Sequence, residues 1–180
     1  MSDTTPPLSL TAATSIERPI VERLLQLYLH DFSGFARADD PYGKVDGRGR
    51  FAYPHLDRYW QDSSSEPLLF RVGADLAGFA LVNDWSASGR GTDRAVAEFF
   101  VMRKYRRAGL GTRAALEIIQ QRPVTWEISV ADYNQPAQEF WSAVVASLRG
   151  FETHMLDGDG DRWAGPIWRL TPSVAKTAER

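Results

Sequence analysis

The chain has 180 residues, a formal net charge of −2 and no cysteine. This length allows one domain with a real core, and the lack of cysteine excludes disulfides, zinc–cysteine sites and a cysteine nucleophile. The mildly acidic charge argues against a nucleic-acid binder, and no stretch approaches the roughly 20 apolar residues of a membrane span. The start, MSDTTPPLSL, has no signal-peptide pattern, so we expect a cytoplasmic protein without nucleic-acid or membrane partners.

The apolar pattern predicts alternating strands and helices within a single domain. We expect a disordered leader at 1–7, a domain at 8–171 and a flexible tail at 172–180, because neither end has apolar periodicity. The expected elements are a strand from 8, helices at 19–30 and 53–61, strands at 67–73, 76–84 and 94–102, a helix at 109–122, a strand at 124–130, a helix at 136–148, and a hairpin around the turn at 157–161. The order β-α-α-β-β-β-α-β-α-β-β indicates an α+β fold with a mixed sheet.

Positive charge is concentrated in one part of the chain. Residues 90–122 contain eight Arg or Lys and three Asp or Glu, a local charge of +5, so the rest carries −7. Within this region the stretch VMRKYRRAGLGTRAALEII (101–119) joins a predicted strand to a predicted helix through two glycines. The asymmetry suggests one anionic ligand at one place.

The glycine-bearing turn has the chemistry of an anion site. Unpaired N–H groups and the helix dipole favour an anion at a helix start, and Gly109 and Gly111 leave room for it to approach the backbone. A diphosphate is a suitable ligand. The alternative is a tight turn with a solvated basic face. The stretch lacks the G-x-x-x-x-G-K-[ST] of a P-loop and the third glycine of a dinucleotide fingerprint.

Three motif pieces resemble the GNAT superfamily of acyl-CoA-dependent N-acyltransferases. Residues 106–111, RRAGLG, match its [QR]-x-x-G-x-[GA] motif. Asn134, Ala137 and Phe140 match N-x-x-A-x-x-[FL]-[YF], and Gly150 with Phe151 matches the glycine–phenylalanine pair that follows it. The resemblance covers about residues 68–156, and it implies a mostly antiparallel central sheet flanked by helices.

The resemblance also implies which residues would bind each part of the coenzyme. The main chain of Val101, Met102 and Arg103 would pair with the pantetheine arm. Backbone amides would hold the pyrophosphate, and they come from Arg106, Arg107, Ala108, Gly109, Leu110, Gly111 and Thr112. Asn134, Phe140 and Trp141 would line the coenzyme tail. The cosubstrate implied is acetyl-CoA.

Three residues are candidates for the chemistry itself. The Val101 N–H would donate to the thioester oxygen as charge develops there. Glu98 would accept the amine proton, with an ion pair to an arginine such as Arg94 as its alternative role. Relatives often have tyrosine where this chain has Trp141, and an indole cannot protonate the leaving thiolate. Tyr133 is the substitute we consider.

The sequence therefore predicts an N-acetyltransferase that moves an acetyl group from acetyl-CoA to a primary amine by direct attack in a ternary complex. The acceptor is a small amine or a protein amino group, no metal is expected, and a homodimer is compatible with the sequence. The main alternative is a non-catalytic acyl-CoA-binding or regulatory module of the same fold. A basic patch for RNA or DNA is the weakest interpretation, because the rest of the chain is acidic.

Overall fold

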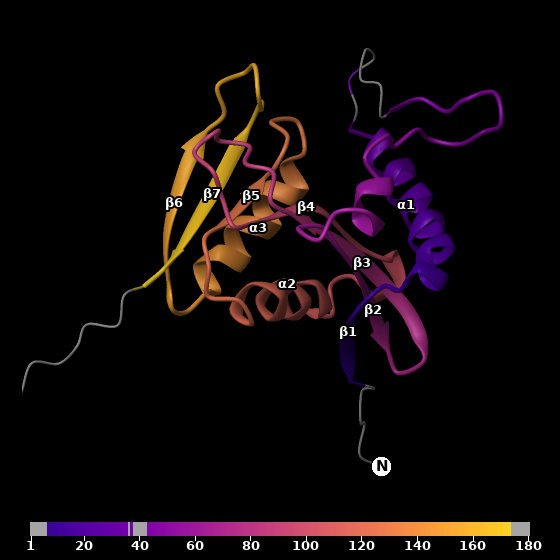
Figure 1. Cartoon of the computed structure of the whole chain (residues 1–180), viewed down its shortest axis with the longest axis horizontal. Coiled ribbons are helices and arrows are strands. Elements are labelled where there is room, and N and C mark those ends of the chain that lie inside the picture. The colour runs from indigo at the N-terminus through magenta and orange to yellow at the C-terminus, as the bar shows by residue number, and fades with distance from the viewer. Residues whose placement is uncertain (1–6, 36, 38–42, 174–180) are drawn as a thin grey trace, which may run out of the picture. The chain divides into compact units, whose positions relative to one another are not determined.

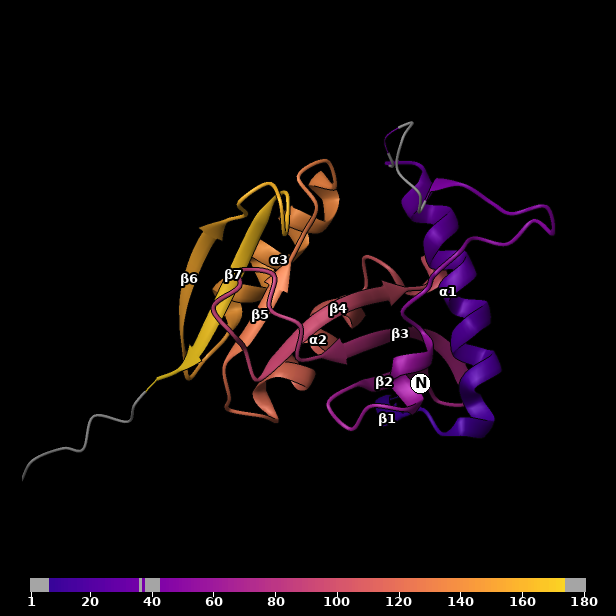
Figure 2. The same ribbon diagram turned by 45° about the horizontal axis from the view of Figure 1, so that its top comes forward.

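The computed structural model describes residues 7–35, 37 and 43–173 (Figures 1 and 2). Positions 1–6 of the predicted leader, positions 174–180 of the predicted tail, and residues 36 and 38–42 lie outside the described ranges. Its strands are β1 (Leu8–Ala12), β2 (Glu66–Val72), β3 (Asp75–Asn83), β4 (Arg94–Val101), β5 (Trp126–Ser129), β6 (Phe151–Asp157) and β7 (Pro166–Pro172). Its helices are α1 (Arg18–Ser33), α2 (Leu110–Gln120) and α3 (Gln135–Ser147), with the short 3-10 turns η1 (Ser15–Glu17), η3 (Asp57–Trp60) and η4 (Arg103–Tyr105).

The predicted α+β class is confirmed, with strands in the order β1-β2-β3-β4-β5-β7-β6 and mostly antiparallel pairing. The predicted helix at 53–61 is the one expected element whose type differs in the structure. It contains only the short 3-10 turn η3, whose hydrogen bonds run from Tyr59 N–H to Leu56 C=O and from Gln61 N–H to Arg58 C=O. Pro54 and the short run explain the difference, since an α-helix needs more turns to offset its nucleation cost.

The chain divides into two compact units. The first holds the residues up to Asn83 together with Val96–Ala114, and the second holds Asp84–Ala95 and the residues from Ala115 onward. None of the helices in the described ranges has the length and apolar character needed to cross a bilayer.

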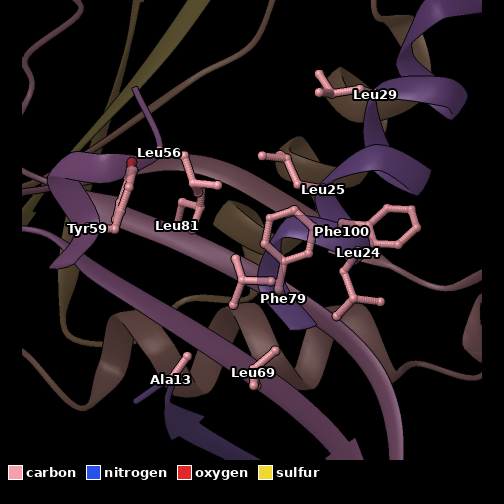
Figure 3. Packing of buried hydrophobic residues seen from close by; sticks show 11 residues of the cluster. Ala13, Leu24, Leu25, Leu29, Leu56, Tyr59, Leu69, Phe79, Leu81 and Phe100 are labelled. Carbon is pink, nitrogen blue, oxygen red and sulfur yellow. The ribbon is translucent and has the colours of Figure 1, made fainter. Parts of the chain in front are cut away.

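The first unit packs α1 on strands β2, β3 and β4. Figure 3 shows Leu24, Leu25 and Leu29 of α1 facing the sheet residues Phe79 and Phe100. These leucines recur at helical spacing and are at most 5% exposed. Burying each one contributes roughly 1.5–3 kcal/mol. The amphipathic pattern of α1 therefore fixes which side of the sheet the helix covers.

A glycine brings β3 and β4 unusually close together. A Cβ added at Gly78 would lie 2.1 Å from the carbonyl oxygen of Phe100. No side chain fits there, so glycine is required for the register of β4. That register sets the position of the C-terminal end of β4, which is Val101.

The second unit packs α3 against the antiparallel strands β5, β7 and β6. Trp141, Val144 and Val145 form the buried face of α3. The predicted C-terminal hairpin is confirmed: β6 pairs with β7 from Phe151 opposite Pro172 to Asp157 opposite Pro166. In the turn, Asp159 Oδ1 accepts hydrogen bonds from the backbone N–H groups of residues 161–163, as expected for a turn-forming aspartate.

Candidate active site

The stretch between β4 and α2 folds into a loop with two left-handed residues. Arg107 has a φ of 65° and Gly109 a φ of 74°. The Gly109 carbonyl accepts the N–H of Arg113 at 3.0 Å, so α2 effectively starts from this glycine. These two left-handed residues turn the chain sharply between η4 and the first turn of α2.

The N–H groups of this loop are open. Within the described part of the chain, none of the six backbone N–H groups from Arg107 to Thr112 donates a hydrogen bond of ordinary length and angle to a backbone carbonyl. The last three belong to the first turn of α2, where no intrahelical acceptor exists. The dipole of α2 adds partial positive charge at the same point. This run of donors is suited to an anion with several oxygen atoms, such as a diphosphate.

The cations around the loop are mostly engaged within the protein. Arg106 donates from Nε to the Val101 carbonyl at 2.7 Å and from Nη2 to Asp31 Oδ2 at 2.5 Å. Arg103 donates to the other oxygen of Asp31 at 2.6 Å. The Arg106 guanidinium thus fastens the loop to α1, while the Arg107 side chain is exposed and forms no ion pair within the described ranges.

Asp31 is the residue of this cluster that sequence reasoning missed. Burial raises its pKa, but the hydrogen bonds from Arg103 and Arg106 outweigh that effect and hold the pKa below the ordinary value of 3.8. It precedes its two partners by 72 and 75 residues. A surplus of cations in the loop hinted at an acidic partner, but nothing in the sequence indicated which one.

Val101 lies at the end of β4 with its peptide groups turned away from β3. The next residue, Met102, donates its N–H to Ala77 of β3 at 2.8 Å. Successive residues of a strand point their N–H and C=O groups to opposite edges, so those of Val101 point to the other edge. The Val101 carbonyl accepts from Arg106 there. The N–H predicted to stabilise an oxyanion is therefore directed to the same edge as that carbonyl.

Glu98 lies on β4, three residues before Val101, among tyrosine hydroxyls. Tyr53 donates to Glu98 Oε1 at 2.9 Å, and Tyr28 of α1 forms a second hydrogen bond to the carboxyl group. Burial raises the pKa of Glu98 to about 7, although both hydrogen bonds act to lower it. The groups placed against this carboxyl are tyrosines and not the arginine of the alternative role.

The alternation of side chains between the two faces of β4 explains these contacts. Phe100 is on the same face as Glu98, and its ring lies 6.0 Å from that of Tyr28, whereas Phe99 faces Phe70. Burial raises the pKa of Tyr53 above its ordinary value, so its hydroxyl stays protonated and donates at neutral pH. Tyr28 and Tyr53 precede Glu98 by 70 and 45 residues, and no local pattern connects them to it.

The remaining predicted residues lie in the second unit. Asn134 caps α3, with its side-chain oxygen accepting from Ala137 N–H at 3.2 Å. Phe140 and Trp141 pack edge to face with ring centres 5.1 Å apart, and Trp141 is buried. Tyr133 lies, partly buried, in the turn between β5 and α3. Their roles toward a coenzyme or a thiolate stay predictions.

Comparison with known proteins gives a family and a fold. Residues 22–144 match the model of the acetyltransferase (GNAT) family. No curated protein matches the chain in sequence. Among solved structures, an acetyltransferase from Thermus thermophilus is similar with a TM-score of 0.60 and 17% identity, over 94% of this chain and 99% of that one.

Two further structures illustrate the range of similar proteins. The ribosomal-protein-S18-alanine N-acetyltransferase of Escherichia coli has a TM-score of 0.54 and 13% identity, over 97% of this chain and 99% of its own. The PaiA N-acetyltransferase of Thermoplasma acidophilum, solved in complex with coenzyme A, has a TM-score of 0.55 and 11% identity, over 93% and 99%. At such identities the similarity establishes the fold alone.

Proposed function

Because the chain belongs to the acetyltransferase (GNAT) family, we propose that it transfers the acetyl group of acetyl-CoA to a primary amine by direct attack in a ternary complex. The acceptor is a small amine or a protein amino group. The observation that carries the proposal is the run of six open N–H groups from Arg107 to Thr112, which the short turn η4 connects to the strand that holds Glu98 and Val101.

In this proposal the loop binds the coenzyme through its pyrophosphate. The open N–H groups and the first turn of α2 would donate to the phosphate oxygens, and Arg107 would add a charge-assisted hydrogen bond, worth about 1.5–3 kcal/mol. Arg103 and Arg106 would act indirectly, since their ion pairs with Asp31 hold the loop in shape. A similar protein of this fold, the PaiA enzyme, was solved with coenzyme A bound, which agrees with this assignment.

The chemical step needs a base, because an amine with a pKa near 10.4 is neutral in only about one molecule per thousand at pH 7.4. Glu98, with a pKa of about 7, would accept the amine proton, directly or through water. The amine nitrogen attacks the thioester carbon, and the Val101 N–H donates to the oxygen as it becomes negative. The carbon–sulfur bond then breaks, and the thiolate takes a proton from Tyr133 or from water.

A second candidate function is a non-catalytic acyl-CoA-binding module. The observation that favours it is Trp141, a buried indole where relatives often have a tyrosine acid. A thiol with a pKa near 8.5 leaves fairly well without assistance, so the loss does not exclude catalysis. Release of free coenzyme A with any amine would exclude the non-catalytic module.

The test of the proposal is calorimetric titration with acetyl-CoA. The wild-type protein should bind with a micromolar Kd, about −8 kcal/mol. Gly111→Glu places a carboxylate in the first turn of α2, where it would repel the pyrophosphate while leaving the helix itself stable. Gln120→Glu adds the same charge at the other end of α2 as a matched control. Equal binding by all three proteins, or binding by none, would overturn the pyrophosphate assignment. An amine screen on the binding-competent protein then tests transfer.

A further inference from the structure

The side chain of Gln26 holds a distant piece of backbone in place. It donates from Nε2 to the Phe51 carbonyl at 3.0 Å, and its Oε1 accepts the Phe51 N–H at 2.8 Å. A carboxamide has the same donor and acceptor as a peptide group, so this pair of bonds imitates one step of a strand ladder. Gln26 lies on α1, one to two turns after Pro19, and it anchors residue 51 to that helix.

The anchored segment is a small hairpin, residues 45–51, next to α1 (Figures 1 and 2). Val45 and Phe51 pair across it, and Asp46 closes its tip by accepting the backbone N–H groups of Arg48 and Arg50 at 2.8 and 3.0 Å. These bonds are all within the hairpin. The hairpin is attached to α1 through the Gln26 pair and an edge contact between Phe51 and His30, with ring centres 6.4 Å apart, and the Phe51 side chain also packs against the core.

The hairpin leads directly to the carboxyl group of the candidate site. Tyr53, two residues after Phe51, donates to Glu98 Oε1 at 2.9 Å. Two residues of chain span at most about 7 Å, so the position of Phe51 restricts where the Tyr53 ring can lie. The contacts thus form a continuous path from Gln26 through Phe51 and Tyr53 to Glu98.

We propose that Gln26 is a positioning residue for the acetyl transfer: by fixing the hairpin on α1, it holds the Tyr53 hydroxyl against the Glu98 carboxyl. The inference rests on the proposed function, in which Glu98 is the base. A hydrogen bond to the ionised form of a carboxyl favours that form. Without the Gln26 anchor, the Tyr53 hydrogen bond weakens and Glu98 holds its proton to higher pH.

Other groups around Glu98 limit the size of this effect. Tyr28 of α1 also bonds to the carboxyl, and Tyr59 of η3 lies close enough to be affected by its charge. His55 contacts the Tyr53 ring with centres 6.0 Å apart, and Arg106 lies 5.4 Å from the ring of Phe100 beside Glu98 on β4. Tyr28 is carried by α1 and Arg106 is held by Val101 and Asp31, so neither depends on the hairpin, and a change in Glu98 on replacing Gln26 reports on the segment that carries Tyr53.

The test uses Gln26→Met, which keeps the size and helix propensity of the side chain but removes both hydrogen bonds. A charged-group hydrogen bond of about 1.5 kcal/mol corresponds to about one pH unit. The acid limb of the kcat/KM profile should therefore move up by about one pH unit, and kcat/KM below pH 6 should fall about tenfold while its high-pH plateau stays. Arg23→Met, an exposed change three residues earlier on α1, is the control and should leave the profile unchanged.

A double-mutant cycle separates positioning from general destabilisation. Tyr53→Phe should shift the profile in the same direction, and adding Gln26→Met to it should shift it no further, because Gln26 acts through the lost hydroxyl. NMR titration of the Glu98 carboxyl carbon measures the same shift in the folded protein without any turnover. A Glu98 titration that moves in Tyr53→Phe but not in Gln26→Met would overturn the inference. A shared shift in a protein that acetylates no amine would overturn the proposed function and leave the effect of Gln26 on Glu98 supported.

Discussion

Replacing Glu98 by glutamine should stabilise the fold and remove the proposed base at the same time. The carboxyl group lies in a partly buried position on β4, with hydroxyl donors from Tyr28 and Tyr53 and an aromatic neighbour in Phe100. The fold keeps this group where its ionised form is poorly solvated. Glutamine has the same shape and can still accept the Tyr53 hydrogen bond, but it has no charge to desolvate.

The size of the effect follows from the pKa of Glu98. Its pKa rises from the ordinary 4.5 to about 7 in the folded protein. At 1.36 kcal/mol per pH unit this corresponds to about 3 kcal/mol. Between these two values the folded state binds the proton and the unfolded chain releases it, so stability falls as pH rises. The stabilising contribution is complete below pH 4.5 and is lost by about pH 7 and above.

Urea denaturation between pH 4 and 9 measures this directly. Glu98→Gln should match the wild type near pH 4 and exceed it by about 3 kcal/mol above pH 8. Glu139→Gln, which removes an exposed carboxylate from α3, controls for the change in net charge. The same Glu98 variant should turn over about 10²–10⁴-fold more slowly while binding acetyl-CoA as the wild type does. A stability difference that does not change with pH would refute the assigned burial of the charge.

Two further substitutions test the loop and the core of the second unit. Gly109→Ala places the new methyl group in open space but forces a φ of +74° on alanine. It should therefore lower the unfolding free energy in urea by about 1–2 kcal/mol and weaken acetyl-CoA binding in calorimetry. Gly47→Ala, also in open space but without a positive φ, is the control and should change neither quantity. Arg169→Met removes the cation that lies 2.7 Å from the buried Glu127 carboxylate and should lower the unfolding free energy in urea by about 3–5 kcal/mol. The control Arg149→Met changes an exposed residue and should lower it little. Equal losses of unfolding free energy in the two variants would contradict the importance of the ion pair.

The sequence was most informative where a pattern repeats over several turns or strands. The apolar spacing of α1 and α3 and the alternation along β3 and β4 each indicated the element and its buried face. The segment at 53–61 gave a misleading helical pattern, because its apolar residues pack η3 on the core without enough turns to form an α-helix. Local apolar periodicity predicts a helix reliably only when the segment is long enough for its hydrogen bonds to offset the cost of nucleating the helix.

The loop between β4 and α2 was also predictable from local sequence, because glycines and a helix start within a dozen residues determine its conformation. The sequence by itself determined the order of the seven strands and the three α-helices, the family resemblance and the glycine-bearing turn before α2. Tertiary structure alone decided that Asp31 holds Arg103 and Arg106, and that Tyr28 and Tyr53 surround Glu98. Backbone conformation follows from neighbouring residues, whereas the pKa of a carboxyl group depends on which distant side chains exclude water from it and donate to it. Those partners are chosen by packing, 45 to 75 residues away along the chain.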